Sequence, residues 1–154
     1  MKKTRPSIHE YLMSIAREAA KRSTCTSHHP TGAVAAISGR VVMTGYNGVP
    51  SGMQHCDDAG CVRMSDGKHA YLLHAEENLV AQAARYQIKL LGVTVYCTHQ
   101  PCPHCAAMLV QAGVACVVYD EAETDSLEKE SYSSVVMAIG GVETVSLKSL
   151  GGEG

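Results

Sequence analysis

Apolar residues follow two different periods in the first third of the chain. Across residues 7–22 they recur at the spacing of one helical face, and Ser7 stands where a helix N-cap belongs. That face comprises Ile8, Tyr11, Leu12, Ile15, Ala16 and Ala19. Residues 32–37 and 41–46 are short apolar runs on either side of Ser38-Gly39, a pair typical of turns. We therefore expect a helix followed by a β-hairpin.

Helical and strand patterns alternate in the second half of the chain. The expected elements are a helix at 72–85, a strand at 93–98, a helix at 103–112 closed by Gly113, a strand at 114–119, a helix at 126–139 ended by Gly140-Gly141, and a strand at 142–147. This alternation predicts a layered α/β fold. We expect one domain over residues 1–150 and a disordered tail at 151–154.

Residues 47–67 fit neither period and are rich in Gly, Asp and Cys. A structureless loop of this length is unusual inside a compact domain unless it has a function or is held in place. The segment is therefore predicted to be a long loop with one of these two properties.

Composition narrows the class of protein. The chain has 154 residues, 45% of them hydrophobic, which suits one globular domain. Its 13 Lys and Arg against 15 Asp and Glu give a net charge of -2, which favours a small substrate over a long nucleic acid. No apolar run approaches the roughly 20 residues of a membrane span, and no apolar signal segment follows Lys2 and Lys3. Seven cysteines, an odd number, favour a reducing compartment, so we expect a cytoplasmic protein without a membrane partner.

Two thiols stand close together at the start of a predicted helix, in Pro101-Cys102-Pro103-His104-Cys105. The positive end of the helix dipole favours thiolates there, and this spacing lets both sulfurs face one ion. A lone Cys-x-x-Cys pair is also typical of redox proteins, so this segment alone does not decide between a metal site and a redox pair.

A second motif, His74-Ala75-Glu76, supplies what the cysteines lack. A single histidine is more often a core or surface residue than a ligand, but this one opens a predicted helix, as the cysteines do. One His and two Cys would leave the fourth tetrahedral position of a zinc ion open for water, whose pKa the metal lowers. Glu76, beside the metal without binding it, would then move the protons. The combination His-x-Glu…Pro-Cys-x-x-Cys is the signature of zinc nucleobase deaminases.

With these motifs, the chain resembles the deoxycytidylate (dCMP) deaminase family, including its phage members and the bacterial late-competence branch. The resemblance covers roughly residues 7–145 and rests on Lys21-Arg-Ser-Thr-Cys25, Gly32-Ala-Val34, Thr44-Gly-Tyr-Asn-Gly48 with Pro50, His55-Cys56, His74-Ala-Glu-Glu-Asn78 and Pro101-Cys-Pro-His-Cys-Ala106. It implies a cytidine-deaminase-like three-layer α/β/α sandwich around a central mixed five-stranded sheet. It also implies zinc-dependent hydrolysis of dCMP to dUMP and ammonia, which supplies dUMP for thymidylate synthesis, in a bacterium or in the host of a phage.

The same resemblance implies roles for further residues. The substrate pocket would be lined by Gly32, Ala33, Asn47, Ala75 and Pro101. The activator dCTP and the inhibitor dTTP, with Mg²⁺, would bind around Tyr46, Asn47, Gly48, Pro50 and Gly52, in a homo-oligomer that is commonly a hexamer. Because Asn-Gly is an ordinary turn dipeptide, this loop also has a purely structural interpretation.

Four residues have no role at the first zinc: Cys25, Cys56, Cys61 and His69. Phage relatives hold a second, structural zinc with Cys and His from matching regions, and the resemblance implies the same site here. Four ligands would close the coordination shell and hold the long loop in place. The alternative is that Cys25 is a small buried hydrophobe and His69 a surface residue. Cys97 and Cys116 lie in predicted strands and are expected in the core.

The chain also departs from the family pattern. Many relatives carry a basic residue three positions before the catalytic His or shortly before the Gly-Ala-Val stretch, where this chain has Tyr71 and His29-Pro30-Thr31, and Glu123 replaces a common Tyr. Alternatives are therefore a zinc deaminase for dCTP, CMP, cytidine or tRNA adenosine, and a non-catalytic zinc module. The modest basic content argues against tRNA. The presence of Glu76 argues against a non-catalytic module, because a structural zinc does not need that carboxylate.

Overall fold

A computed structural model describes residues 5–120 and 127–150, without the side chains of residues 127–131. Its centre is a five-stranded sheet with the strand order β2-β1-β3-β4-β5. The strands are β1 (Gly32–Ile37), β2 (Arg40–Tyr46), β3 (Thr94–Cys97), β4 (Cys116–Tyr119) and β5 (Glu143–Ser146). β1 runs antiparallel to both of its neighbours, whereas β3, β4 and β5 are parallel, so the sheet is mixed, as expected.

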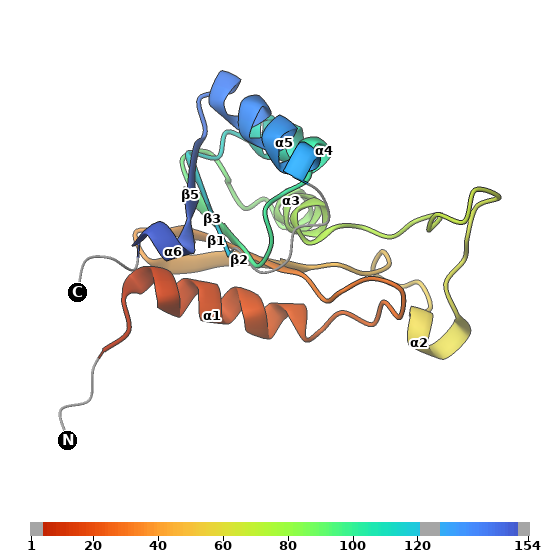
Figure 1. The fold of residues 1–154 in the computed structure, drawn as a ribbon. Helices are drawn as coiled ribbons and strands as arrows, with labels where there is room; N and C mark the ends of the chain where they lie inside the picture. The colour runs from red at the N-terminus through yellow and green to blue at the C-terminus, as the bar shows by residue number, and fades with distance from the viewer. Residues whose placement is uncertain (1–4, 121–126, 151–154) are drawn as a thin grey trace.

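Helices cover both faces of this sheet (Figure 1). One face carries α1 (Ile8–Ala20) and the short α6 (Leu147–Leu150), and the other carries α3 (Ala75–Arg85), α4 (Pro103–Gln111) and α5 (Leu127–Ile139). Alternate side chains of β1 divide between the layers: Val34 and Ala36 pack with α1, whereas Ala33 and Ala35 pack on the side of α3 and α4. The three-layer α/β/α sandwich expected from the sequence is therefore confirmed.

α1 lies unusually close to β1. Its first turn is closed by a capping box, in which the Ser7 hydroxyl accepts the Glu10 N–H and the Glu10 carboxylate accepts the Ser7 N–H, both at 3.2 Å. The helix buries Leu12, Met13, Ala16 and Ala20. A Cβ atom added to Gly32 would lie 2.0 Å from the carbonyl oxygen of Ala16, so only glycine permits this packing. The first residue of β1 is thereby fixed against the helix.

Two elements differ from the sequence prediction. The helix expected from residue 72 begins at Ala75, because Leu73 exchanges backbone hydrogen bonds of 3.1 and 2.9 Å with Gly48 and so stays extended. The last predicted strand ends at Ser146, and the next four residues form α6, which was not predicted. Leu147 packs against the core cluster that contains the buried residues of α1. A short apolar run such as the one that ends at Leu147 is compatible with a strand or with a helix, so its pattern did not reveal where the strand ends.

The long loop after β2 is partly ordered by short elements. It contains α2 (Cys56–Ala59) and a β-bridge between Arg63 and His69. The tail expected at 151–154 lies outside the described residues, and the single-domain boundary stays a prediction. In the described part of the chain, no helix has both the length and the apolar character needed to cross a lipid bilayer.

Candidate active site

The starts of α3 and α4 meet at one point beside the sheet. His74 is the N-cap residue of α3, Cys102 is the N-cap residue of α4, and Cys105 lies in the first turn of α4. Pro103 at the first helical position favours the start of α4 there, because its missing N–H would have no partner in the helix. The Nδ1 atom of His74 lies 3.6 Å from the Sγ atom of Cys102 and 3.5 Å from that of Cys105. The three residues predicted as ligands are thus brought together from two helices.

The donor set and its spacing fit a zinc ion. The ligand atoms of His74, Cys102 and Cys105 all lie within 4.8 Å of one another. Around a tetrahedral zinc with Zn–S of about 2.3 Å and Zn–N of about 2.05 Å, nitrogen and sulfur ligands are about 3.6 Å apart. Three donors leave the fourth position for a reactant, and the exposure of His74 opens the site to solvent on one side.

The three donor groups have different pKa shifts and therefore differ in protonation near neutral pH. The hydrogen bond between the two thiols lowers the pKa of Cys102 to about 3 and raises the pKa of Cys105. A hydrogen bond with Cys102 raises the pKa of His74 to about 9. Near neutral pH, Cys102 is therefore a thiolate, while His74 and Cys105 carry protons that a metal ion must displace.

Glu76 is the second residue of α3 and lies beside this cluster. It is 8% exposed, and burial raises the pKa of its carboxyl group. The neighbouring Cys105 side chain lowers this pKa by less than burial raises it, yet Glu76 is not part of the group of three ligand atoms. A buried carboxyl group that lies beside the donors without being one of them is placed to hold and transfer protons.

Glu77 ties the two helix starts together, a role that was not predicted from the sequence. Its Oε2 atom accepts the backbone N–H of His74 at 2.7 Å, and its Oε1 atom lies 3.3 Å from the Nε2 atom of His104 in α4. The available signal was its position three residues after the N-cap, which is the spacing of a capping box. Asn78 adds a contact to β2 by donating to the Tyr46 carbonyl at 2.8 Å. The start of α3 is therefore anchored to both α4 and β2.

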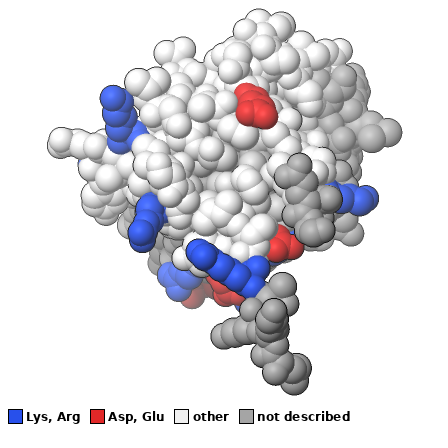
Figure 2. Space-filling model, turned by 90° about the vertical axis from the view of Figure 1, so that its left-hand side faces the viewer, with Lys and Arg blue, Asp and Glu red and all other residues white. Residues whose placement is uncertain are grey.

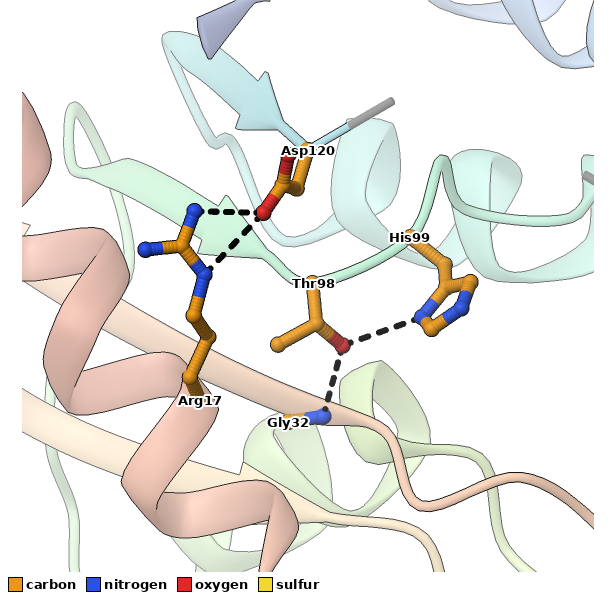
Figure 3. Close-up of polar contacts among 5 residues, drawn as sticks. All are labelled: Arg17, Gly32, Thr98, His99 and Asp120. Carbon is orange, nitrogen blue, oxygen red and sulfur yellow. Dashed lines mark hydrogen bonds and ion pairs between the residues drawn. The ribbon is translucent and has the colours of Figure 1, made fainter. Parts of the chain in front are cut away.

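A hydrogen-bond network at the strand ends was also missed by sequence reasoning (Figure 3). The buried Thr98 hydroxyl accepts the Gly32 N–H at 3.0 Å and lies 3.2 Å from the Nδ1 atom of His99. Thr98 also donates its backbone N–H to the Gly32 carbonyl at 3.0 Å. On the other side, Arg17 of α1 donates to one carboxylate oxygen of Asp120 through Nε at 3.1 Å and Nη2 at 2.6 Å. These contacts join the beginning of β1, the ends of β3 and β4, and α1.

Three of the expected pocket residues have buried apolar side chains: Ala33, Ala75 and Pro101. Contact with a ligand would therefore have to use their backbone atoms. Ala75 is the first residue of α3, where N–H groups lack partners within the helix. Its amide is thus suited to donate a hydrogen bond to a carbonyl oxygen.

Asn47 is buried, and its side chain binds the segment that precedes β1. Its Oδ1 atom accepts the Thr31 N–H at 2.8 Å, and its Nδ2 atom donates to the His29 carbonyl at 3.1 Å. A carboxamide offers two donors and two lone pairs, so one of each remains for a further contact. Asn47 therefore shapes this wall and retains capacity to bind a ligand.

The second predicted set of donors also converges. The ligand atoms of Cys25, Cys56, Cys61 and His69 lie within 4.8 Å of one another. His28 is close as well, with its Nδ1 atom 3.5 Å from the Cys25 Sγ atom. Burial, aided by the neighbouring Cys61, raises the pKa of Cys56 to about 12. Four donors match a closed tetrahedral shell, and they link the end of α1 to the long loop.

A cavity of about 450 Å³ lies between β2, the loop that follows it and α3. Its lining includes Tyr46, Pro50 and Gly52 of the expected effector site, together with His55 and Gln82. Asn47 and Gly48 are not among its lining residues: Asn47 holds the segment before β1, and Gly48 pairs with Leu73. The loop therefore borders a hollow and is more than a tight turn.

Known proteins are similar to this chain in sequence and in fold. The family model of the cytidine and deoxycytidylate deaminase zinc-binding region matches residues 6–121. The deoxycytidylate deaminase of Saccharomyces cerevisiae is 38% identical over 133 residues, which are 83% of this chain and 41% of the yeast protein. That of Mycobacterium phage D29 is 34% identical over 128 residues, which are 75% of this chain and 96% of the phage protein. The chain thus spans less than half of the yeast relative.

A solved structure supports the same relationship. The dCMP deaminase of cyanophage S-TIM5, in complex with dCMP and dUMP, superposes with a TM-score of 0.76. It is 30% identical, and the match covers 94% of this chain and 100% of that one. Since the family model spans most of the described residues and the fold agrees, the chain belongs to the family of the cytidine and deoxycytidylate deaminase zinc-binding region.

Proposed function

We propose that this chain is a zinc-dependent hydrolase that converts dCMP to dUMP and ammonia and so supplies dUMP for thymidylate synthesis. The observation that carries the proposal is the His74–Cys102–Cys105 cluster with the buried Glu76 beside it. The relatives add the choice of substrate, because they are named deoxycytidylate deaminases and the cyanophage enzyme holds dCMP and dUMP.

Proton transfer is assigned to Glu76. Zinc bound by the three donors would supply a water molecule acidified to a pKa of about 7. Glu76 takes a proton from this reactant and delivers it to N3 of the cytosine ring, which makes C4 more electrophilic. Once the water oxygen has bonded to C4, Glu76 takes the remaining proton of that oxygen and gives it to the amino group. The bond between C4 and this nitrogen then breaks, and the nitrogen leaves as ammonia. Burial of Glu76 limits exchange of these protons with bulk water.

The substrate would lie against Gly32, Ala33, Asn47, Ala75 and Pro101. The N–H of Ala75 at the helix start suits the carbonyl oxygen of the base. The remaining donor and lone pair of Asn47 suit the sugar or the phosphate. In this arrangement the amino group of the base would face the three metal ligands and Glu76.

A structural zinc is proposed at Cys25, Cys56, Cys61 and His69. Its support is the convergence of four donors from segments that are far apart in the sequence. Four protein ligands leave no open position, so this ion would hold the loop and take no part in the reaction.

Regulation by nucleotides is proposed at the cavity beside β2. Its volume of about 450 Å³ lies within the range of small-molecule sites. dCTP as activator and dTTP as inhibitor, with Mg²⁺, would bind at the loop of Tyr46, Asn47, Gly48, Pro50 and Gly52 in a homo-oligomer, a hexamer in the family pattern. The three of these residues that line the cavity would contact the nucleotide, and the other two would hold the loop.

Charge and thiol state support a small substrate and a cytoplasmic location. The face in Figure 2 carries separated basic and acidic side chains without a continuous basic stripe, unlike proteins that follow a long polyanion. The five cysteines of the two clusters form no disulfide bond, as metal binding requires and a reducing compartment would preserve.

The test is an ammonia-release assay on the zinc-loaded protein with cytidine, dCMP, CMP and dCTP, each with and without activating dCTP and Mg²⁺. We expect dCMP to be the preferred substrate and dCTP to activate. Tyr71 and the stretch His29-Pro30-Thr31 stand where many relatives have basic residues, so the second candidate is another cytosine nucleotide or nucleoside, namely dCTP, CMP or cytidine. Preference for one of these would replace dCMP in the proposal, and absence of ammonia with every substrate would overturn the proposed activity.

A further inference from the structure

A further possible metal ligand lies beside the second set of donors. That set, which we call the second cluster, consists of Cys25, Cys56, Cys61 and His69. The Nδ1 atom of His28 lies 3.5 Å from the Sγ atom of Cys25, and the Nε2 atom of His69 lies 3.9 Å from the same sulfur. The first distance equals the separation of His74 and Cys105 at the catalytic cluster, and nitrogen and sulfur ligands of one tetrahedral zinc ion are about 3.6 Å apart. His28 therefore stands at ligand distance from Cys25, although it is outside the second cluster.

The rings of His28 and His69 are neighbours, but they come from different segments of the chain. Their centroids lie 4.9 Å apart, and their planes are inclined by 59°. His28 belongs to the connection between α1 and β1, whereas His69 lies on a small hairpin of the long loop, residues 62–70. In this hairpin the Ala70 N–H donates to the Val62 carbonyl at 3.0 Å. Two separate segments thus bring an imidazole to the same thiol.

The segment before His28 is held at the second cluster by contacts of its own. The Thr24 hydroxyl lies 2.9 Å from the Nδ1 atom of His55, the N-cap residue of α2. The Thr26 hydroxyl lies 3.7 Å from the Sγ atom of Cys61. Neither contact uses the hairpin, so His28 would stay beside the cysteines if the hairpin moved away.

We infer that His28 is an alternative ligand of the second zinc ion and takes the place of His69 when the hairpin moves away. The inference rests on the proposed structural zinc. One metal–nitrogen bond replaces another, so three thiolates and one imidazole close the tetrahedral shell in both arrangements. Because the two rings lie side by side, the exchange concerns the imidazole position alone and does not compensate for a missing cysteine. The chain between His69 and His74 can then move while the ion stays bound.

The affinity test uses the whole chain carrying both Cys102→Ala and Cys105→Ala, so that zinc binds only at the second cluster. In this background His28→Ala, His69→Ala and the variant with both changes are compared by competition with a chelator. Each single change should weaken zinc binding by less than about tenfold, because the other imidazole remains. Both changes together should weaken it at least about tenfold more than the product of the single losses, since residues that replace each other are not additive.

His9→Ala is the matched control in the same background. Its ring hydrogen-bonds with the Tyr96 hydroxyl at 2.9 Å near the other end of α1, so zinc affinity should not change. If His28 only hydrogen-bonded with Cys25 from outside the shell, the two losses would multiply. A double variant that loses no more than this product would therefore overturn the inference.

A direct measurement needs no double variant. In the same background, His69→Ala is loaded with an NMR-active cadmium isotope in place of zinc. The ring protons of His28 should show scalar coupling to the metal, because such coupling passes through a metal–nitrogen bond. Absence of this coupling, or loss of the ion from His69→Ala, would overturn the inference.

Failure of the proposed function has different signs. A ratio of one zinc ion per wild-type chain would overturn the second site and this inference with it. Wild-type protein that releases no ammonia from any cytosine substrate would overturn the proposed activity, whereas the affinity and cadmium measurements would still decide the role of His28.

Discussion

The Nδ1 atom of His74 lies 3.5 Å from the Sγ atom of Cys105, although 31 residues separate them along the chain. Each is placed by the start of a helix, so backbone geometry more than loop conformation sets the distance. The N-terminal ends of α3 and α4 lie at this cluster, and the positive ends of their helix dipoles favour negative charge there. They stabilise the Cys102 thiolate before any metal binds.

Glu76→Gln keeps the shape of the side chain but removes the group that transfers protons. We expect kcat for dCMP to fall by about 10²- to 10⁴-fold, the usual contribution of general acid–base catalysis. Zinc content by elemental analysis should stay at the wild-type value, because Glu76 is not one of the three clustered ligands. Glu77→Gln is the control: its amide oxygen can still accept the His74 N–H, so the loss should stay below about tenfold. Normal ammonia release by Glu76→Gln would mean that another group moves the protons.

Binding of the catalytic zinc should release about two protons near pH 7. The pKa of His74 is raised to about 9 and that of Cys105 is raised, so both are protonated at pH 7, whereas Cys102, with a pKa of about 3, is already ionised. Zinc affinity should therefore rise as the pH rises toward 9 and fall as the solution becomes acidic. Calorimetric titration of metal-free protein in buffers of different ionisation enthalpy counts the protons.

Zinc binding at the second cluster would release further protons and so raise the number measured by calorimetry. The difference between the wild type and a variant carrying both Cys102→Ala and Cys105→Ala isolates the catalytic site, because the second set of donors remains intact. A difference of zero protons would show that His74 and Cys105 do not hold theirs in the metal-free protein.

Gly32→Ala should lower the free energy of unfolding by about 1–3 kcal/mol, the usual cost of overpacking. The added Cβ atom would lie 2.0 Å from the Ala16 carbonyl oxygen, and a backbone atom cannot move aside without shifting α1. Urea unfolding measures the change as a lower midpoint at an unchanged slope. Gly48→Ala is the matched control, since its Cβ atom would come no closer than 3.7 Å to the Tyr46 ring. Equal midpoints for the two variants would refute the tight contact between α1 and β1.

The convergence of His74, Cys102 and Cys105 was predictable because each half of the cluster is a local pattern at a helix start. Contacts that join segments far apart in the sequence were not predictable in this way. The bonds between Thr98 and Gly32 depend on β1 lying between β2 and β3, an order that one sequence leaves open. The Arg17–Asp120 pair spans 103 residues and has no local pattern at all.

The error in the predicted start of α3 also comes from a contact between segments that are far apart in the sequence. Leu72 and Leu73 fit the apolar face of the following helix, and periodicity alone extends the helix to include them. Pairing of Leu73 with Gly48, a residue in a loop far back along the chain, keeps this segment extended and moves the helix start to Ala75. Tertiary hydrogen bonds therefore decided a boundary that local preference had placed earlier.

The second cluster should hold one zinc ion, so that the protein carries two zinc ions per chain by elemental analysis. Cys61→Ser should reduce this number to one, lower the Tm and increase proteolysis between residues 47 and 73, because loss of the ion frees the loop from the end of α1. Cys116→Ser should keep both ions, since Cys116 lies in β4 and belongs to neither cluster. A ratio of one zinc per wild-type chain would show that these four residues are held together by packing alone. Loss of the second ion with turnover retained in Cys61→Ser would assign it a structural role, because the catalytic donors come from α3 and α4.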